Sequence, residues 1–412
     1  MTKKSDTDDL GYLFDHEMGR RDFMLDSLAA GGLLAGGLSL TSRLANAAPP
    51  EDEVVRLGYL PITDATSLLV AYAKGFFKEE GLKAEEPTLI RGWSSLVEGF
   101  TAGKFNLVHL LKPIPVWMRY NNDFPVKITA WAHINGSGLV VGRHKEAQSF
   151  ADLGGSQIAV PYWYSQHNII LQMGLREAGL KPVLKAMTAE LAPDEVNLSI
   201  MPPPDMAPAL ASQKIDGYIV AEPFNAAGEL MAGAKMLRFT GDIWRNHPCC
   251  VVCMNENTLN AKPEWSQKVT NAVVKAQVFA QQNKAEVAHL LSKDGEGYLP
   301  MPADVVTQAM TSYADADYAR PDAIQHPDWD NGRIDFQPYP FPSATRFLVD
   351  AMKQTKVGGD TTFLTELESD FVAQDLVEYR YVEQAMKQIK GWESAPGIDM
   401  ANPFQREEVI KL

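Results

Sequence analysis

Aromatic, hydroxyl and imidazole side chains gather between residues 160 and 168, where the chain has the sequence Val-Pro-Tyr-Trp-Tyr-Ser-Gln-His-Asn. Aromatic faces can line a small ligand, and the Ser165 hydroxyl and the His167 imidazole can donate hydrogen bonds to an anion. The apolar spacing from Ile169 onward predicts a helix, whose N-terminal amides would be further donors. The stretch is typical of a ligand-binding corner.

The three aromatic residues of this corner cannot all face one ligand, because successive side chains of an extended segment point to opposite sides. We expect the alternate pair, Tyr162 and Tyr164, to face the ligand and at least one aromatic residue to pack inside the protein. His167 could also cap the helix or lie in the core, but its place at a strand-to-helix corner favours ligand contact.

The strands and helices that must position this corner can be predicted from the chain before it, where apolar runs alternate with helical patterns. Between Val54 and His133 the pattern predicts four strands and three helices, an order typical of a parallel sheet with helices on both faces. Thr63 and Asp64 follow the first strand. Either residue could cap the next helix or contact a ligand, and the sequence favours neither role. Lys112 lies at a strand end before Pro113, and we expect it to be solvated.

The second half of the chain has a different pattern. Gln157–Val160 reads as a buried strand leading into the corner, and helical periodicity dominates from Pro263 onward. The region Tyr318–Pro342 is rich in Pro and Asp, which predicts a long surface loop.

Length and charge limit the possible functions. A chain of 412 residues exceeds the usual size of one domain, so we expect two lobes. The net charge of -14 argues against nucleic acid or an anionic membrane as partner, although it allows a local anion site. We predict an export signal at residues 1–47 and the first part of lobe I at residues 48–138. Lobe II would follow at residues 139–221, and a second part of lobe I with C-terminal helices at residues 222–412.

The N-terminus has the features of an export signal. Arg20 and Arg21 are followed by Phe23, then by a short apolar run rich in Gly and Ala, and then by Ala45-Asn46-Ala47. This order resembles a twin-arginine translocation signal, although residues 1–19 form an unusually long acidic leader. We therefore expect a periplasmic protein that is exported already folded, rather than a disordered tail with a chance pair of arginines.

Three cysteines, Cys249, Cys250 and Cys253, lie within five residues. Three thiols on one short strand are poorly placed to surround zinc, because alternate side chains point to opposite faces. We expect small buried hydrophobic residues and neither a metal nor a cofactor, while a vicinal disulfide remains open.

Several motifs occur together in a fixed order. The chain opens with Gly58-Tyr59-Leu60-Pro61-Ile62-Thr63-Asp64-Ala65 and Lys74-Gly75-Phe76-Phe77. Across roughly residues 54–280 there follow Trp93, Pro113-x-Pro115, Asn135-Gly136-Ser137-Gly138, His167-Asn168, Pro202-Pro203-Pro204, Glu222-Pro223-Phe224-Asn225 and Trp244-Arg245-Asn246-His247-Pro248. The series resembles the solute-binding proteins of ABC importers in the nitrate, bicarbonate and cyanate group, whose wider relatives bind sulfonates, taurine and thiamine-precursor pyrimidines.

The resemblance implies an α/β fold of the type II periplasmic-binding class, with two lobes that close around a ligand cleft. In the nitrate-binding relatives a Trp, a Gln, a His and a Lys hold the anion. Trp93 and His167 match two of these, whereas Ser137 stands in place of the Gln and Arg245 in place of the Lys. A shorter Ser and a bidentate Arg favour a larger or planar oxyanion, such as a carboxylate or sulfonate.

Glu222 is the remaining candidate ligand residue. The bicarbonate relatives use calcium with a Glu among its ligands, but a calcium site needs several oxygen ligands together. We include Glu222 among the binding residues as a hinge-side carboxylate, and a structural role is favoured over calcium binding.

The resemblance predicts a capture protein that is not an enzyme. It would bind a small oxyanion or small polar organic anion as a monomer and deliver it to an ABC permease and its ATPase. One alternative is an enzyme like the pyridoxal-phosphate-dependent pyrimidine synthase of the same fold, although the cysteines do not form its motif and an export signal conflicts with a cytoplasmic synthase. Another is a sensory periplasmic binding subunit.

Overall fold

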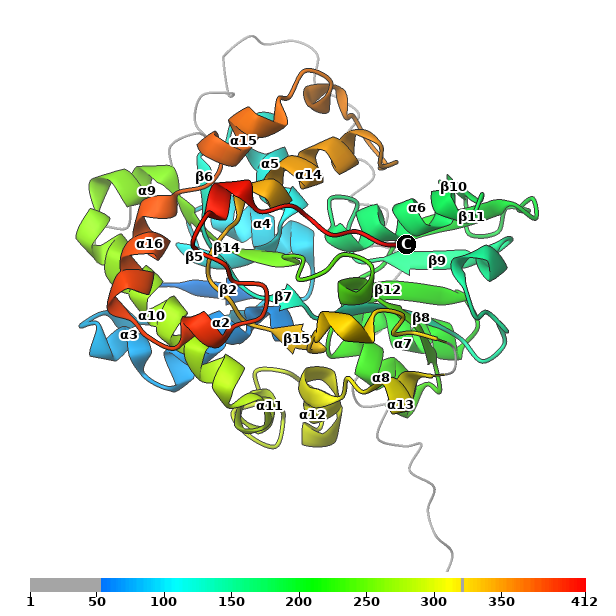
Figure 1. Cartoon of the computed structure of the whole chain (residues 1–412), viewed down its shortest axis with the longest axis horizontal. Helices are drawn as coiled ribbons and strands as arrows, with labels where there is room; N and C mark the ends of the chain where they lie inside the picture. Colours follow the sequence, from blue (N-terminus) through cyan, green and yellow to red (C-terminus); the bar gives the residue numbers. More distant parts are fainter. Residues whose placement is uncertain (1–52, 320–321) are drawn as a thin grey trace, which may run out of the picture. The chain divides into compact units, whose positions relative to one another are not determined.

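The computed structural model describes residues 53–319 and 322–412, all of which belong to one compact unit, Leu44–Leu412 (Figure 1). The predicted export signal at 1–47 lies outside the described residues. Among the residues described, no helix has both the length and the apolar character needed to cross a membrane.

The first sheet has the strand order β4-β2-β5-β14-β6. Its strands are β2 (Leu57–Tyr59), β4 (Thr88–Leu89), β5 (Leu107–Leu111), β6 (Val126–Trp131) and β14 (Cys250–Asn255). The expectation of an all-parallel sheet is wrong, because β14 runs antiparallel between β5 and β6. Every residue of β14 is buried, as a strand in the middle of a covered sheet must be.

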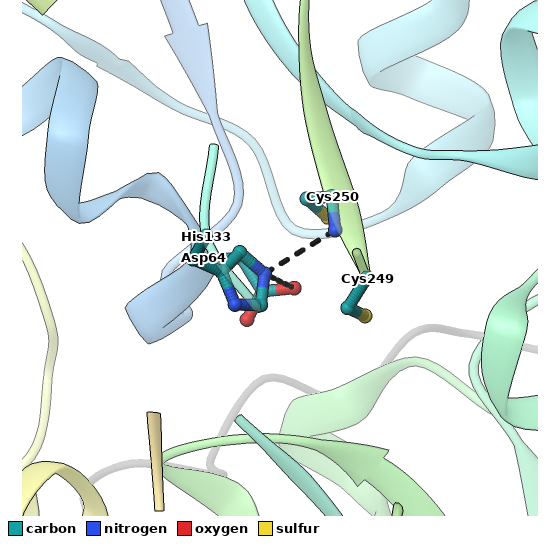
Figure 2. Close-up of side chains that lie close together, drawn as sticks. All are labelled: Asp64, His133, Cys249 and Cys250. Carbon is teal, nitrogen blue, oxygen red and sulfur yellow. Dashed lines mark hydrogen bonds and ion pairs between the residues drawn. The ribbon is translucent and has the colours of Figure 1, made fainter. Parts of the chain in front are cut away.

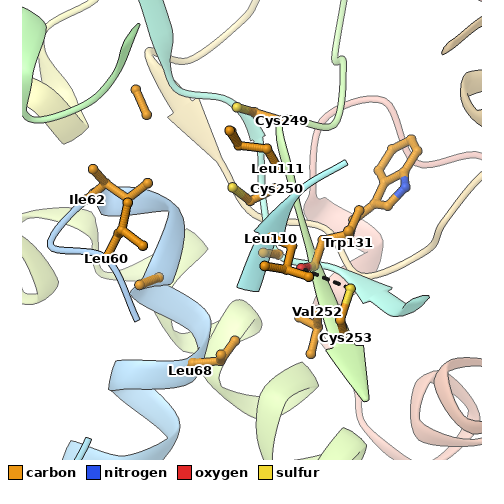
Figure 3. Close-up of a cluster of buried hydrophobic side chains, with 14 of the residues drawn as sticks. Leu60, Ile62, Leu68, Leu110, Leu111, Trp131, Cys249, Cys250, Val252 and Cys253 are labelled. Carbon is orange, nitrogen blue, oxygen red and sulfur yellow. Dashed lines mark hydrogen bonds between the residues drawn. The ribbon is translucent and has the colours of Figure 1, made fainter. Parts of the chain in front are cut away.

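Helices cover the first sheet and build its core. α2 (Thr66–Ala73) packs on α10 (Pro263–Gln282), and α10 also packs on α16 (Tyr379–Gln388). Leu60, Leu68, Leu110 and the cysteines of β14 meet in the interior of this region (Figure 3). The expectation of three buried cysteines is therefore confirmed.

The second sheet has the strand order β10-β11-β9-β12-β8-β13. Its strands are β8 (Ser137–Val141), β9 (Gln157–Val160), β10 (Lys181–Val183), β11 (Glu195–Ile200), β12 (Gly217–Ala221) and β13 (Lys235–Phe239). Because β13 belongs to this sheet, strand membership extends past the expected boundary at residues 221/222. We propose that lobe II ends after Phe239.

The chain enters the second sheet through a tight turn at Asn135-Gly136. Both residues have positive φ, 59° and 80° respectively, a conformation that Asn and Gly tolerate better than other residues. The turn places Ser137 at the start of β8, directly after the crossing.

The second part of the region Tyr318–Pro342, residues 333–342, is buried rather than a surface loop, contrary to expectation, whereas exposed residues such as Asp322, Asp328 and Asp330 lie in its first part. β15 (Ile334–Asp335) pairs with β7 (Ile134–Asn135), and Arg333, Gln337 and Tyr339 are at most 2% exposed. Aromatic residues interleaved with the prolines give this segment an apolar surface that packs into the core.

The remaining helices and short strands complete the described chain. They are β1 (Val54–Val55), α3 (Phe76–Glu79), β3 (Lys83–Ala84), α4 (Trp93–Thr101), α5 (Pro113–Tyr120), α6 (Gln166–Glu177), α7 (Pro203–Ala211), α8 (Phe224–Met231), α9 (Glu256–Ala261), α11 (Lys284–Leu291), α12 (Ala303–Thr311), α13 (Asp315–Tyr318), α14 (Pro342–Lys353) and α15 (Ser369–Asp375).

Candidate functional site

Buried polar side chains collect at one edge of the first sheet. Asp64 lies in the short turn after β2, His133 follows β6, and Cys249 precedes β14. Because β14 runs antiparallel to β6, the first residue of β14 lies at the edge of the sheet where β6 ends. All three side chains are 0% exposed. This edge is where open α/β sheets usually bind ligands.

Ser137 and His167 form the central pair of the site. The Ser137 Oγ lies 2.9 Å from the Nε2 of His167. His167 is held in the first turn of α6, because the Ser165 side chain caps this helix by accepting a hydrogen bond from the backbone N–H of Asn168 at 3.0 Å. Ser137 and His167 are both buried, as the prediction of a shared ligand site requires.

Cys249 connects this pair to the first sheet. Its Sγ lies 3.7 Å from the Ser137 Oγ and 3.8 Å from the His167 Nε2. The two sheets therefore meet through a thiol, a hydroxyl and an imidazole. The local sequence around Cys249 gives no sign that this residue lies close to His167, so Cys249 could not be predicted as part of the site.

Three further polar groups near the N-termini of α4 and α6 have no hydrogen-bond partner among the described residues. They are the Nε1 of Trp93, the side-chain amide of Gln166 and the Nδ1 of His167. Trp93 is 3% exposed and Gln166 is 0% exposed. Since buried polar groups are normally hydrogen-bonded, these groups are candidates for contact with a ligand. Gln166 was missed, although its place beside His167 in the first turn of a helix was a usable signal.

Trp93 is buried and is the first residue of α4. Its ring meets the His109 ring edge-on, with the centroids 5.6 Å apart. Tyr162 is half-buried nearby. Burial raises the pKa of Tyr162, while the hydroxyl of Ser94, on the same helix as Trp93, lowers it.

His109 and His247, two further buried histidines, have pKa values low enough that their imidazoles are neutral at physiological pH. Burial lowers the pKa of His109 to about 3, and its Nε2 accepts a hydrogen bond from the Leu60 backbone at 3.0 Å. Burial also lowers the pKa of His247 to about 4, and its Nε2 lies 2.8 Å from the Thr240 hydroxyl. His109 and His247 therefore contribute neutral polar groups to the site and no positive charge.

Asp64, His133, Cys249 and Cys250 form a compact cluster at the same edge (Figure 2). The His133 Nε2 lies 3.0 Å from the Asp64 Oδ2 and 3.2 Å from the Cys250 backbone N. Burial acts to lower the pKa of His133, but the Asp64 carboxylate raises it to about 10. Burial acts to raise the pKa of Cys249, but Cys250 and the imidazoles of His167 and His133 hold it well below its usual value.

Tyr164 is not placed with this cluster. Its ring stacks on Trp117 of α5 at 5.7 Å, and its hydroxyl donates to the backbone oxygen of Asp360 at 3.2 Å. The proposed alternate pair therefore separates, because the chain between β9 and α6 is a bent turn in which strand alternation does not hold.

Arg245 and Glu222 are engaged in other contacts. An Nη2 group of Arg245 donates to the Trp329 backbone oxygen at 3.2 Å, and its ring contact is also with Trp329. The Glu222 carboxylate accepts from the Arg333 Nε at 2.7 Å and from the Ala226 backbone at 3.0 Å. These contacts give Glu222 a structural role and direct the Arg245 guanidinium toward the C-terminal half of the chain.

Comparison with known proteins gives the wider context. The model of the NMT1-like family matches residues 48–292. The nitrate/nitrite binding protein NrtA of Nostoc sp. is 25% identical over 360 residues, which cover 81% of this chain and 76% of that protein.

A region of a larger transport protein is also similar. The bicarbonate transport ATP-binding protein CmpC of Synechocystis is 24% identical over 258 residues, which cover 58% of this chain but only 37% of that protein. Among solved structures, the periplasmic nitrate-binding protein NrtA from Synechocystis aligns with a TM-score of 0.68 at 17% identity, over 83% of this chain and 90% of that one. The predicted periplasmic-binding fold is confirmed.

Proposed function

The chain belongs to the NMT1-like family and is homologous to NrtA nitrate-binding proteins, and on this basis we propose that it is the solute-binding component of an ABC importer. It captures a small oxyanion between its two lobes. One observation carries the proposal: beside the buried Ser137–His167 pair the first turn of α6 holds Gln166, whose buried side-chain amide has no partner within the described part of the chain. The buried indole N–H of Trp93, whose ring meets that of His109, is a further donor without a partner there.

The donor set favours a small monovalent oxyanion. An indole, a primary amide and an imidazole each offer N–H groups, and such donors suit a compact anion whose charge is spread over several oxygens. The expectation of a larger or planar anion depended on two residues, the shorter Ser137 and Arg245 as a bidentate fork. Because the described contacts of Arg245 are with Trp329 and the C-terminal segment, the part of that argument that rests on Arg245 loses its support.

The proposed partners are a permease and an ATPase in the cytoplasmic membrane. In support, a region similar to this chain occurs within a bicarbonate transport ATP-binding protein. Delivery to a permease requires a location outside that membrane, which the twin-arginine signal would provide. The relatives compared are named for binding and transport, which supports a non-enzymatic role over the synthase alternative. We also propose that the protein is a monomer. A sensory subunit would use the same site.

Binding calorimetry on ligand-free protein tests this function. The protein is unfolded in denaturant, dialysed and refolded to remove any anion, and then titrated with nitrate, nitrite, bicarbonate, cyanate, taurine and an aromatic carboxylate. We expect one-to-one binding of a small inorganic oxyanion, with weaker or no binding of the two organic anions. Chloride at equal ionic strength is the control. A refolded protein with native circular dichroism that binds none of the six anions would contradict the proposal.

A further inference from the structure

The cluster of Asp64, His133, Cys249 and Cys250 has the composition of a transition-metal site. Each residue offers one ligand atom, the four atoms lie within 4.8 Å of one another, and all four residues are buried. A tetrahedral zinc ion with bonds of about 2.0–2.3 Å needs its ligand atoms about 3.3–3.8 Å apart.

The Asp64 carboxylate is the strongest sign that this cluster binds a cation. It is 0% exposed, and neither of its oxygens has a partner in hydrogen-bond geometry within the described chain. Its Oδ2 lies 3.0 Å from the His133 Nε2, so an ion pair with His133 offsets part of the cost of burying this carboxylate. A metal ion coordinated by both side chains would supply that counter-charge and also bond to the Asp64 oxygen.

The structure also removes the reason for expecting no metal at these cysteines. Strand alternation would separate two adjacent thiols, but β14 begins at Cys250, so that Cys249 lies in the turn before it. Both thiols therefore reach the cluster (Figure 2). Cys253 lies further along β14, and the nearest partner of its Sγ is the Val251 backbone oxygen at 3.9 Å. Cys253 therefore serves as the control residue for substitutions of Cys249 and Cys250.

We propose that Asp64, His133, Cys249 and Cys250 bind one tetrahedral divalent metal ion of the zinc class. Two thiolates, an imidazole and a carboxylate suit zinc, whereas calcium and magnesium require oxygen ligands. Four protein ligands leave no open position, so the ion is structural. It ties the turn after β2, the end of β6 and the start of β14 together. Through Cys249 it also positions the Ser137–His167 pair.

Metal titration of the reduced full-length protein tests the site without any anion ligand, so its outcome is separate from that of the transport proposal. The protein is dialysed against a chelator and titrated with Co²⁺. We expect one Co²⁺ per chain, with the ligand-field absorption of a tetrahedral ion and a thiolate charge-transfer band, both of which Zn²⁺ abolishes by displacement. Cys249→Ser and Cys250→Ser should each weaken binding about 100-fold, while Cys253→Ser retains it.

X-ray absorption of the zinc-loaded wild-type protein gives a second readout that requires no variant to fold. We expect two sulfur neighbours at about 2.3 Å and two nitrogen or oxygen neighbours at about 2.0–2.1 Å. A shell of nitrogen and oxygen alone would overturn the proposal. So would equal losses of binding in the Cys253→Ser and Cys250→Ser variants, or reduced protein that binds no Co²⁺. Protein that holds a Cys249–Cys250 disulfide and binds no metal after reduction would also overturn it.

Discussion

The thiol of Cys249 lies 3.8 Å from the Nε2 of His167, so the residue that directly precedes β14 of the first sheet contacts an imidazole in the first turn of α6. His167 in turn contacts Ser137, the first residue of β8 after the chain crosses between the sheets. A substitution at any one of these three side chains should therefore alter the contacts of both sheets. The arrangement also places the proposed anion site and the proposed metal site on either side of one sulfur atom.

Replacing His167 with Ala should weaken anion binding by about 10- to 150-fold, because hydrogen bonds to charged groups contribute about 1.5–3 kcal/mol. Calorimetry with the best anion of the wild-type panel measures this change. His144→Ala is the matched control, since this partly exposed histidine pairs with Asp216 on the second sheet. Equal affinity in the two variants would remove His167 from the binding site.

Arg333→Met should destabilise the fold by about 3–5 kcal/mol, because it leaves Glu222 buried without its partner. The Arg333 Nη2 lies 2.6 Å from Glu222 and 2.7 Å from Glu229. Urea unfolding followed by circular dichroism gives the free energy of unfolding. Adding Glu222→Gln to the variant should restore part of the loss.

The surface pair Arg346–Asp370 is the control for this experiment. Its atoms are 3.5 Å apart and the Asp370 side chain is 77% exposed. Arg346→Met should cost about 1 kcal/mol or less, since solvent weakens exposed ion pairs. A loss in Arg333→Met as small as this would show that the buried pair does not stabilise the protein.

Trp117→Leu should lower anion affinity by about 2- to 12-fold without removing any ligand contact. Trp117 belongs to α5 and stacks on Tyr164, which precedes α6, with the ring planes 21° apart. Such an aromatic contact contributes about 0.5–1.5 kcal/mol, and we expect it to favour the closed arrangement of the lobes because Trp117 lies in the first lobe and Tyr164 in the second. Stopped-flow kinetics should assign the change to faster dissociation. Phe371→Ala, a change at a 54% exposed ring, should leave both rates unchanged.

The sequence was most informative where function depends on local signals. His167 could be singled out because a strand-to-helix corner is visible in the chain itself, whereas Ser137 was expected in the site only because the resemblance implies it; the structure brings the two side chains together. The Asp64–His133–Cys249–Cys250 cluster could not be predicted, since its members come from three segments that only the fold brings together. The insertion of β14 between β5 and β6 is the main reason. A parallel sheet was expected from the order of the first four strands, and nothing in those strands indicates a later antiparallel neighbour.

Burial was harder to predict than element type. Tyr318–Pro342 was expected at the surface because prolines and aspartates are typical of loops. In the structure Phe336, Tyr339 and Phe341 are buried, and the backbone N–H of Trp131 donates to the backbone oxygen of Pro338 at 2.9 Å. Lys112 is a second example, because the expectation of a solvated lysine is wrong: its side chain is 0% exposed and lies over the Trp131 ring at 5.4 Å.

Lys112 should make stability depend on pH in the alkaline range. Burial lowers its pKa from 10.5 to about 7 in the folded protein. Between these two values the unfolded chain binds more protons than the folded one, so the free energy of unfolding should rise with pH across this window. Below pH 7 the lysine is charged in both states and its full burial cost remains. Lys112→Met should therefore stabilise the protein at pH 7, by up to about 5 kcal/mol, and flatten this rise.

Urea unfolding of wild type and Lys112→Met at pH 7, 8, 9 and 10 measures this difference directly. Other groups that titrate in the same range contribute equally to both proteins, so the difference between the curves isolates Lys112. Lys104→Met, a change at an exposed lysine, should leave the wild-type pH dependence intact. If the Lys112→Met curve instead ran parallel to that of the wild type, the buried lysine would be charged throughout. Its counter-charge would then have to be Glu408, the carboxylate that acts to raise its pKa.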